Sequence, residues 1–411
     1  AFLHPPSLPS VMHRLQQVAR HIGSASARLP STQGWKRTTA TKATNGEAEV
    51  SPVLVTPRPN GCLTMSLQRP KALNSLSLPM VRLLTAGLKQ HADKSKYVLV
   101  YGEGEKAFCA GGDIRALAFP EKPNDPSQFF REEYTLNHMI SKNPSPYIAI
   151  MRGITMGGGV GISVHGNVRV ITDNTMFAMP ETGIGLFPDV GGTYFLPKLP
   201  GAIGMYLALT GQSLGARDTL YAGVGTHFIA QDKVQQFIAE LESSTDSLEA
   251  ILAKYASDPP AEKADAKLKS FLPQRRQLID RIFTVNTYEE VGQNLTKELA
   301  QSQDEGEKKW IQDVQKQLAA KSPTSLLITF ECMKVGGSLT LAECLELEFR
   351  IATRISLEGS NGDFAEGVKS VLIDKKHKPQ WKPFRSQEQI RQTYFSPLQK
   401  ELDIPELSLN K

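Results

Sequence analysis

Short, continuous apolar runs bounded by turn residues constrain the fold of this 411-residue chain more strongly than any other feature. "YVLVYG" at 97–102 and "PYIAIMRG" at 146–153 have the length and composition of strands buried on both faces. Ahead of the first run, "SLPMVRLLTAGLKQHAD" at 77–93 carries apolar residues at helical spacing. Strand, loop and helix alternate with short links up to about residue 235. The pattern predicts an α/β fold in which helices cover a layered sheet.

The two ends of this alternating region have their own signals. A hairpin is expected in 52–70, because two apolar runs flank the turn sequence Pro59-Asn60-Gly61. Beyond about residue 235 the strand patterns stop and helical patterns follow. Ser338 is expected to be the N-cap of the last of these helices. The helical patterns cover residues 246–256, 308–321, 322–336 and 338–357.

The net charge of +5 originates in the first 46 residues. These residues contain six Lys and Arg side chains and no Asp or Glu, so removing them leaves −1 for residues 47–411. The segment is rich in Ser, Thr and Arg, and "MHRLQQVARHIG" at 12–23 can form a basic amphipathic helix. These features are typical of a mitochondrial transit peptide, and the alternative is a disordered basic tail. We therefore expect a protein of the mitochondrial matrix, and its near-neutral body gives no electrostatic signal of nucleic-acid binding.

Several classes of site are disfavoured. No apolar run approaches the roughly 18 residues that a membrane helix needs. The four cysteines show no CxxC or zinc-ligand spacing, which favours free thiols in a reducing compartment. "GEGEKA" at 102–107 matches a dinucleotide pattern, but "FCAGG" follows it instead of a helix, and no Walker A sequence occurs. We expect no metal site and no nicotinamide or nucleoside-triphosphate cofactor.

Two glycine-rich turns are expected to follow strands and to enter helices. They are "AFCAGGDIRAL" at 107–117 and "GITMGGGVGIS" at 153–163. Adjacent glycines let the backbone approach a ligand, and amides at a helix N-terminus favour an anion. One such turn is weak evidence, because close packing also requires glycine. Two turns can direct two backbone donors at one oxygen, which is the arrangement of an oxyanion hole.

The segment "MPETGIGLFPDVGG" at 179–192 places Glu181 and Asp189 among glycines and apolar residues, with no basic residue nearby in sequence. On one helix the two acids would be about 12 Å apart along the axis. The glycines and Pro188 favour a folded-back loop that brings both carboxylates to one cavity. There, burial and like charge would raise a pKa and equip the pair for acid–base or nucleophilic work. In the alternative interpretation, Glu181 caps a turn and Asp189 caps a helix that begins near Gly191. From composition alone both interpretations stay open.

These motifs together resemble the crotonase (enoyl-CoA hydratase/isomerase) superfamily from about residue 52 to 385. "LQRPKALNSL", "KAFCAGGDIRAL", "GITMGGGVGISVHG" and "MPETGIGLFPDVGGTYFLPKLPG" occur in the order of that family. The resemblance implies a crotonase-like spiral of ββα units that binds acyl-CoA, and an oxyanion hole that polarises the thioester carbonyl. By position, it implies Gly112 and Gly158 as the two amide donors. Together with the leader at 1–46 indicated by composition, it implies an acyl-CoA-binding core at 47–235 and a helical region at 236–411 that completes the site.

The acids distinguish among the reactions of the superfamily. Its hydratases carry a glutamate in the motif G-G-G-x-E, at the position of Gly161 here, and a second glutamate at the position of Glu181. Where hydratases have glycine after a later proline, this chain has Asp189. One hydratase acid is therefore missing and another acid is present. The resemblance accordingly argues against hydration of a double bond.

"FFREEY", "GLFPDVGG" and "DFAEGVKSVLIDKKHKPQWKP" are similar to hydrolases of the superfamily that cleave short 3-hydroxyacyl-CoA thioesters in mitochondrial valine breakdown. Carried over by position, Glu133, Gly158, Glu181 and Asp189 line the substrate site, with Glu181 and Asp189 as the catalytic pair. The resemblance implies no cofactor, because CoA is part of the substrate. Ser163 and His165 in "GISVHG" do not match the nucleophile-elbow pattern G-x-S-x-G, and His165 is expected to be structural.

Two alternatives stay open. One is a hydratase or isomerase of short enoyl-CoA esters. The other is a component of the small subunit of the mitochondrial ribosome, because similar hydrolase-like proteins have that role in some eukaryotes. The full set of site positions and the absence of basic tails on the body argue against a purely structural role. A homo-oligomer is compatible with the sequence, since the helical C-terminal region can cover its own site or that of a second copy.

Overall fold

The computed structural model describes residues 51–121, 125–260, 268–383, 385–398 and 404–409. The predicted transit peptide lies outside these residues. Strands of the described chain form two sheets, with orders β1-β2-β3-β5-β7-β9 and β4-β6-β8. The larger sheet contains β1 (Val53–Pro57), β2 (Cys62–Leu67), β3 (Tyr97–Gly102), β5 (Tyr147–Met151), β7 (Val168–Ile171) and β9 (His227–Phe228). The smaller sheet contains β4 (Ala107–Cys109), β6 (Ile154–Met156) and β8 (Met176–Ala178).

The predicted N-terminal hairpin is confirmed. β1 and β2 pair antiparallel with Val53 opposite Leu67, and Gly61 of the connecting turn has a φ of 88° that favours glycine. The backbone N–H of Cys62 donates to the Asn60 side chain at 3.1 Å, which closes the turn. The sequence Pro59-Asn60-Gly61 therefore forms the hairpin turn that it predicted.

The remaining strands follow a repeated order that explains the two sheets. In the pairs β3–β4, β5–β6 and β7–β8, the first strand joins the larger sheet and the second joins the smaller sheet. The pairings among β3, β5 and β7, and among β4, β6 and β8, are all parallel. A helical segment follows each pair, so the chain winds as a series of ββα units. The predicted α/β architecture is confirmed. Because its strands are parallel, the smaller sheet presents the carboxyl ends of β4, β6 and β8 at one edge.

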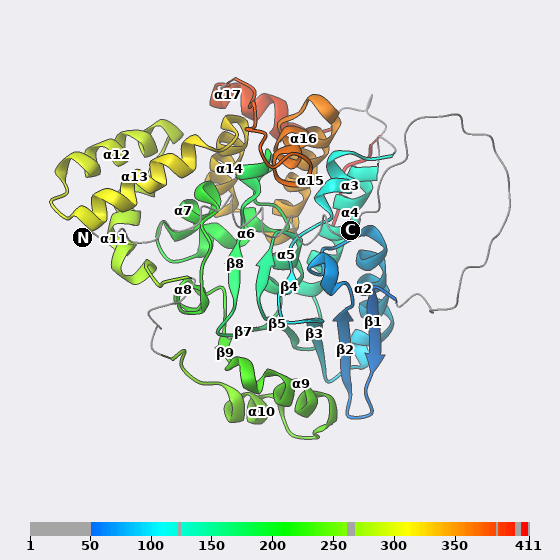
Figure 1. The fold of residues 1–411 in the computed structure, drawn as a ribbon. Coiled ribbons are helices and arrows are strands. Elements are labelled where there is room, and N and C mark those ends of the chain that lie inside the picture. The colour runs from blue at the N-terminus through cyan, green and yellow to red at the C-terminus, as the bar shows by residue number, and fades with distance from the viewer. Residues whose placement is uncertain (1–50, 122–124, 261–267, 384, 399–403, 410–411) are drawn as a thin grey trace.

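Helices cover both sides of these sheets (Figure 1). Alternate residues of β3 and β5 divide between two cores, as strand geometry requires. Leu99 and Ile148 pack with Phe237 of α9 (Val234–Ser243) and Ile251 of α10 (Leu248–Tyr255). The residues on the other face belong to the main core, which extends through the smaller sheet to the C-terminal helices. The main core therefore joins the smaller sheet to the C-terminal helices.

From residue 268 onward the described elements are helical. Figure 1 shows α11, α12 and α13 grouped at one side of the molecule, while α14, α15 and α16 lie over the smaller sheet. No described helix combines the length and apolar character that crossing a membrane requires. Besides α9 and α10, the α-helices of the described chain are α2 (Leu78–His91), α3 (Ile114–Ala118), α4 (Asp125–Ser141), α5 (Gly158–Val164), α6 (Gly192–Phe195), α7 (Ile203–Thr210), α8 (Ala216–Tyr221), α11 (Leu272–Phe283), α12 (Tyr288–Gln301), α13 (Glu305–Ala319), α14 (Pro323–Gly336), α15 (Leu341–Leu357), α16 (Asp363–Val368) and α17 (Gln387–Ile390).

The cap predicted for α15 is wrong. The N-cap is Thr340, whose hydroxyl accepts from the N–H of Glu343, while the Glu343 carboxylate accepts from the N–H of Thr340. This reciprocal pair satisfies two donors at once, which a cap at Ser338 cannot do because the residue three positions on is Leu341. The hydroxyl of Ser338 instead donates to the carbonyl of Val335 at the end of α14.

Candidate active site

Three parallel strands place the candidate site at one edge of the smaller sheet. β4 ends at Cys109 and leads to Gly112, β6 ends at Met156 and leads to Gly158, and β8 ends at Ala178 and leads to Glu181. Because neighbouring parallel strands end on the same side, these three turns lie next to one another. An isolated parallel bridge between Leu76 and Gly112 fixes the first turn against the end of the loop after β2.

The structure brings the two predicted oxyanion residues together. The amide nitrogen of Gly112 lies 3.3 Å from the point that a Cβ of Gly158 would occupy. Gly111 and Gly157, which precede them, have φ values of 111° and 48° that a residue with a side chain rarely adopts. Gly158 is also the first residue of α5, where the backbone N–H has no partner within the helix. The two glycines therefore lie next to each other, and the N–H of Gly158 is unpaired within its helix.

Glu133 enters the site from α4. Its side chain is 2% exposed, and its Oε1 atom reaches the space beside the Cα of Gly158. This oxygen has no hydrogen-bond partner among the described residues. A side chain at residue 158 would collide with it, so glycine is required there for packing as well as for access to the amide.

Glu181 begins a 3₁₀ helix, Glu181–Ile184, directly after β8. Its Oε1 atom is 3.0 Å from the point that a Cβ of Gly157 would occupy, which places the carboxyl group beside the start of α5. Its Oε2 atom is buried and has no partner within the described part of the chain. The carboxyl group therefore lies beside the glycine turn that enters α5, with one oxygen unpaired among the described residues.

Asp189 approaches the same site from the far end of the loop. Its Oδ2 atom accepts a hydrogen bond from the Tyr134 hydroxyl at 2.7 Å, and Tyr134 is the neighbour of Glu133 on α4. The alternative in which Asp189 caps a helix is wrong, because Gly191 is the N-cap of α6 and the Asp189 side chain makes no cap hydrogen bond there. The folded-back loop predicted from the glycines thus places Glu181 and Asp189 at one site. Glu133 of α4 lies close enough for the charges of both to act on it.

Burial determines the protonation of these three carboxyl groups. Desolvation and the charges of Asp189 and Glu181 raise the pKa of Glu133 well above its usual value. Desolvation and the charge of Asp189 likewise raise the pKa of Glu181. For Asp189, desolvation raises the pKa to about 6, although the Tyr134 hydrogen bond opposes the shift. Raised pKa values in such a group suit it to accept and to donate a proton near neutral pH.

A basic group that the local sequence lacks comes from the link that precedes α14. Lys321 is 4% exposed, and the next residue, Ser322, donates its N–H to the carbonyl of Thr182 at 3.2 Å. Desolvation lowers the pKa of Lys321 to about 8, and the charge of Glu181 opposes that shift. The ammonium in turn lowers the pKa of Glu181. Sequence reasoning missed Lys321, because 140 residues separate it from Glu181 and no local motif marks it.

His165 and Glu348 hold the turn that carries Asp189 from two sides. Val190 has a φ of 52°, a left-handed conformation that is strained for a β-branched residue. His165 contacts the Val190 carbonyl through Nε2 at 2.7 Å, and because a carbonyl only accepts, this nitrogen carries the proton. On the other side, the buried carboxylate of Glu348 accepts from the N–H of Gly191 at 2.7 Å and of Thr193 at 2.8 Å.

The structural role expected for His165 agrees with these contacts, and burial lowers its pKa to about 4. A cavity of about 900 Å³ adjoins His165 on the other side of this turn. The residues that line this cavity include none of the five predicted site residues, Gly112, Glu133, Gly158, Glu181 and Asp189. Glu348 was not predicted from the sequence, because helical periodicity does not distinguish a buried carboxylate from an exposed one.

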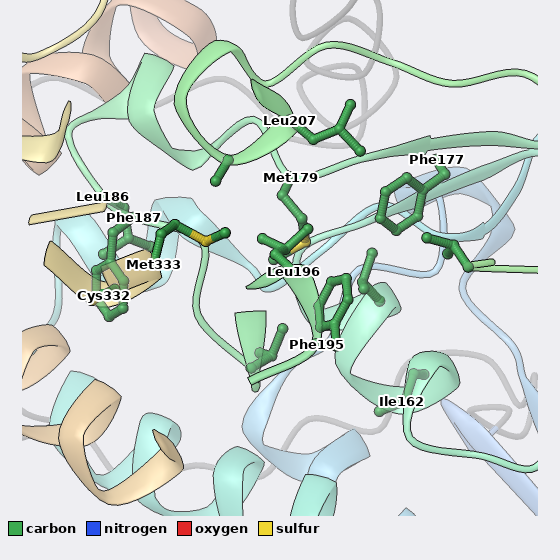
Figure 2. Packing of buried hydrophobic residues seen from close by; sticks show 14 of the residues in the cluster. Ile162, Phe177, Met179, Leu186, Phe187, Phe195, Leu196, Leu207, Cys332 and Met333 are labelled. Carbon is green, nitrogen blue, oxygen red and sulfur yellow. The ribbon is translucent and has the colours of Figure 1, made fainter. Parts of the chain in front are cut away.

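Apolar packing fixes the remainder of the loop. Figure 2 shows Leu186 and Phe187 beside Cys332 and Met333 of α14, with Met179 and Leu196 next to them. Phe187 is completely buried. The apolar residues between Glu181 and Asp189 therefore attach the loop to α14, and the two acids lie at the ends of the attached segment.

The position of the missing hydratase acid is filled by other groups. A Cβ built on Gly161 would lie 2.7 Å from the Cβ of Val190 and 2.9 Å from Nδ2 of Asn137. Carbon atoms do not approach so closely without displacement, so residue 161 has no room for a glutamate. The sequence difference at Gly161 therefore has a steric counterpart in the fold.

Comparison with known proteins gives one consistent family. The family model for enoyl-CoA hydratase/isomerase matches residues 62–396. The chain is 43% identical over 358 residues to a protein of Dictyostelium discoideum named mitochondrial 3-hydroxyisobutyryl-CoA hydrolase, with 82% of this chain and 90% of that protein covered. It is 44% identical over 327 residues to a protein of the same name from Danio rerio, with 78% and 82% covered.

A solved structure shares the fold. The crystal structure of a carnitinyl-CoA dehydratase from Mycobacterium thermoresistibile matches with a TM-score of 0.76 and 34% identity, covering 87% of this chain and 99% of that chain. The resemblance read from the glycine turns and the acid-bearing loop is thereby confirmed, as is the crotonase-like fold. The protein belongs to the enoyl-CoA hydratase/isomerase family, the crotonase superfamily.

Proposed function

We propose that this protein hydrolyses the thioester of 3-hydroxyisobutyryl-CoA, and of related short 3-hydroxyacyl-CoA esters such as 3-hydroxypropionyl-CoA, to the free acid and CoA. The relatives named for this hydrolase support the proposal. One observation of the site carries it. Asp189 lies close enough to Glu181 for its charge to raise the pKa of Glu181, while Val190 and Asn137 occupy the space that an acid at residue 161 would need. The acid pair thus differs from the one that the hydratases of the superfamily carry.

In the proposed mechanism, the N–H groups of Gly112 and Gly158 donate to the thioester oxygen. Negative charge develops on this oxygen when the carbonyl carbon becomes tetrahedral. Preorganised backbone donors stabilise that charge, and the loss of one typically lowers the rate on the order of 100-fold. The buried surroundings strengthen both hydrogen bonds, since water does not compete for them.

Glu181 supplies the attack by one of two routes. As a nucleophile, its carboxylate adds to the carbonyl carbon, the C–S bond breaks, and an anhydride and the CoA thiolate form. Water then hydrolyses the anhydride. As a general base, Glu181 instead takes a proton from water while the hydroxide adds to the carbon and the C–S bond breaks. In both routes the thiolate finally takes up one proton.

Asp189 and Glu133 are proposed to support this chemistry. With a pKa of about 6, Asp189 can position water and the 3-hydroxyl group and pass a proton to the leaving thiolate. Glu133, whose pKa is raised further by both other acids, orients the polar end of the acyl group. No cofactor is proposed, since CoA is the leaving group of the substrate.

The relatives are named as mitochondrial proteins, and the acid-free, basic first 46 residues are of the kind that directs import. The protein is accordingly mitochondrial, and we place its activity in the matrix as part of valine breakdown. We also propose that a second copy of the chain is the partner most compatible with the superfamily, while the near-neutral body offers no surface selected for RNA.

Substitution of each catalytic carboxyl tests the assignment. Glu181→Gln and Asp189→Asn keep the side-chain shapes but remove the charge and the proton-accepting capacity. We expect each to lower kcat for release of free CoA thiol by a factor of about 100 or more. Binding of the CoA ester, measured by calorimetry, should change little. Hydrolysis at near wild-type rates by either variant would contradict the proposed roles.

A further inference from the structure

A buried amide beside the three acids has no partner. Asn137 on α4 is fully buried, and neither its Oδ1 nor its Nδ2 atom is hydrogen-bonded within the described chain. Burying an amide without hydrogen bonds is unfavourable, and buried polar groups in folded proteins are almost always satisfied. Asn137 therefore requires an explanation that the folded chain alone does not give.

The position of Asn137 points to the substrate. Glu133 and Asn137 are four residues apart on α4, so they lie on the same face of that helix one turn apart. This face meets the first turn of α5, where Glu133 reaches Gly158 and Asn137 reaches Gly161. A Cβ at Gly161 would lie 2.9 Å from Nδ2 and 3.1 Å from Oδ1 of Asn137. Two glycines of α5 thus make room for two polar side chains of α4.

The amide also borders the loop that carries the acids. Val190, which directly follows Asp189, contacts the same point beside Gly161. Gly158 and Gly161 are three residues apart in α5, which corresponds to about 4.5 Å along the helix axis. The amide is thus displaced by less than one helical turn from the backbone N–H assigned to the thioester oxygen. A group two carbons from the thioester carbonyl extends over that range.

We propose that Asn137 binds the 3-hydroxyl group of the acyl chain and thereby selects hydroxylated substrates. The inference rests on the proposed hydrolase function. A hydroxyl group donates one hydrogen bond and accepts others, whereas an ionised carboxylate only accepts. An ionised acid of the group can accept a hydrogen bond from the hydroxyl, whereas a neutral amide offers the hydroxyl oxygen a donor whatever the protonation of the acids. Asn137 supplies that donor through Nδ2, and Oδ1 serves as a further acceptor in the same position.

This arrangement selects against acyl chains that lack the hydroxyl. With an unhydroxylated ester bound, the buried amide stays unpaired and the binding free energy is reduced. Sites built to hydrogen-bond a substrate hydroxyl reject the analogue without it by factors of up to about 10⁴. The discrimination should therefore appear in kcat/KM for hydroxylated and unhydroxylated esters of the same carbon skeleton.

The test compares free-thiol release from 3-hydroxyisobutyryl-CoA and isobutyryl-CoA by wild type and Asn137→Leu, which is similar in size and apolar. We expect the ratio of the two kcat/KM values to fall at least about 10-fold in the variant, through loss on the hydroxylated ester. Asn137→Ser, which keeps a donor and an acceptor, should retain part of the ratio and serves if the Leu variant does not fold. Thr329→Val is the matched control, since Thr329 is a buried residue of α14 with an unpartnered hydroxyl.

The outcomes separate this inference from the function on which it rests. Equal losses on both esters in Asn137→Leu would mean that the amide serves the fold or a bound water, and would overturn the inference while leaving hydrolysis established. If wild type releases no thiol from 3-hydroxyisobutyryl-CoA, the proposed function fails. A ratio change in Thr329→Val equal to that in Asn137→Leu would also overturn the assignment.

Discussion

At the scale of single residues, the site depends on how few charges its interior can hold. Glu133, Glu181 and Asp189 are all nearly inaccessible to solvent, and Lys321 is the buried cation that faces Glu181. Each additional negative charge raises the cost of ionising the next carboxyl group. Burial raises the pKa of each of the three acids, like charge adds to the shift of Glu133 and Glu181, and a proton held within the group is favoured. This gives the site a base and an acid within the same group of side chains.

The pH dependence of hydrolysis follows from the direction of these shifts. Glu181 must be ionised to attack or to act as a base, and burial raises its pKa. Asp189, with a pKa of about 6, loses its proton only above that pH. We expect kcat/KM to rise with pH on the acid side, with a midpoint above the usual glutamate pKa of about 4.3. A profile already flat at pH 5 would contradict the protonation states assigned to the acids.

Lys321 should set the position of this acid limb. Its ammonium lowers the pKa of Glu181, so Lys321→Met should move the limb of the kcat/KM profile to higher pH. Lys316→Met is the control, because Lys316 is an exposed residue of α13. A lower plateau with an unmoved limb would show that Lys321 contributes to packing instead of to the ionisation of Glu181.

At the scale of elements, the acid-bearing loop is positioned by contacts with α14 and α15. Phe187 is buried among residues that include Cys332 and Met333 of α14 (Figure 2). Gly336 ends α14 against the backbone of Thr193, and a Cβ there would overlap the Thr193 carbonyl oxygen. The neighbouring Gly337 has no atom within 4 Å of its Cβ position. These adjacent glycines allow a controlled test of the close approach.

Gly336→Ala should destabilise the protein by about 1 to 3 kcal/mol, because the added methyl group forces α14 away from the loop. Gly337→Ala should change the free energy of unfolding by less than about 1 kcal/mol, since its backbone is helical and its surroundings are open. Chemical denaturation of both variants measures the difference. Equal effects of the two substitutions would mean that helix and loop are not closely fixed there.

The elements that sequence reasoning found are those with local signals. The Pro59-Asn60-Gly61 turn and the glycines before α5 each specify their own backbone, and the structure confirms both. The cap of α15 was assigned wrongly, although Thr340 and Glu343 form a capping box that can be read from the sequence.

At the scale of the whole molecule, the groups that complete the site come from far along the chain. Lys321 lies in the link between α13 and α14, and Glu348 lies on α15, yet they act on Glu181 and on the turn after Asp189. No sequence period or spacing encodes such a contact, since it arises only when α14 and α15 pack over the smaller sheet. The family resemblance supplied Glu133, whose position on α4 local reasoning did not mark. The division of the chain at residue 235 stays a prediction.

Glu348 should make global stability depend on pH. Burial raises its pKa to about 8, so the folded protein holds this proton at a pH where the unfolded chain has released it. Its contribution is therefore present in full below the unfolded pKa and is lost as pH rises through about 8. His165, with a pKa lowered to about 4, has the opposite sign, but its contribution is complete above about pH 6.5.

Between about pH 6.5 and 8, the free energy of unfolding of wild type should therefore decrease. Glu348→Gln should weaken this dependence by about 1 to 2 kcal/mol over the interval, since one proton corresponds to about 1.4 kcal/mol per pH unit. Glu305→Gln, at an exposed position, should leave the slope unchanged. Urea denaturation at several pH values gives the slopes, and equal slopes for wild type and Glu348→Gln would refute the assigned protonation.

The central claim is that this member of the family cleaves a thioester instead of adding water to a double bond. The direct measurement is to incubate the purified protein with 3-hydroxyisobutyryl-CoA and with a short enoyl-CoA, following free thiol and enoyl absorbance. We predict rapid thiol release from the hydroxylated ester, abolished in Glu181→Gln, and no appreciable loss of enoyl absorbance. Loss of enoyl absorbance without thiol release from either ester would contradict the account.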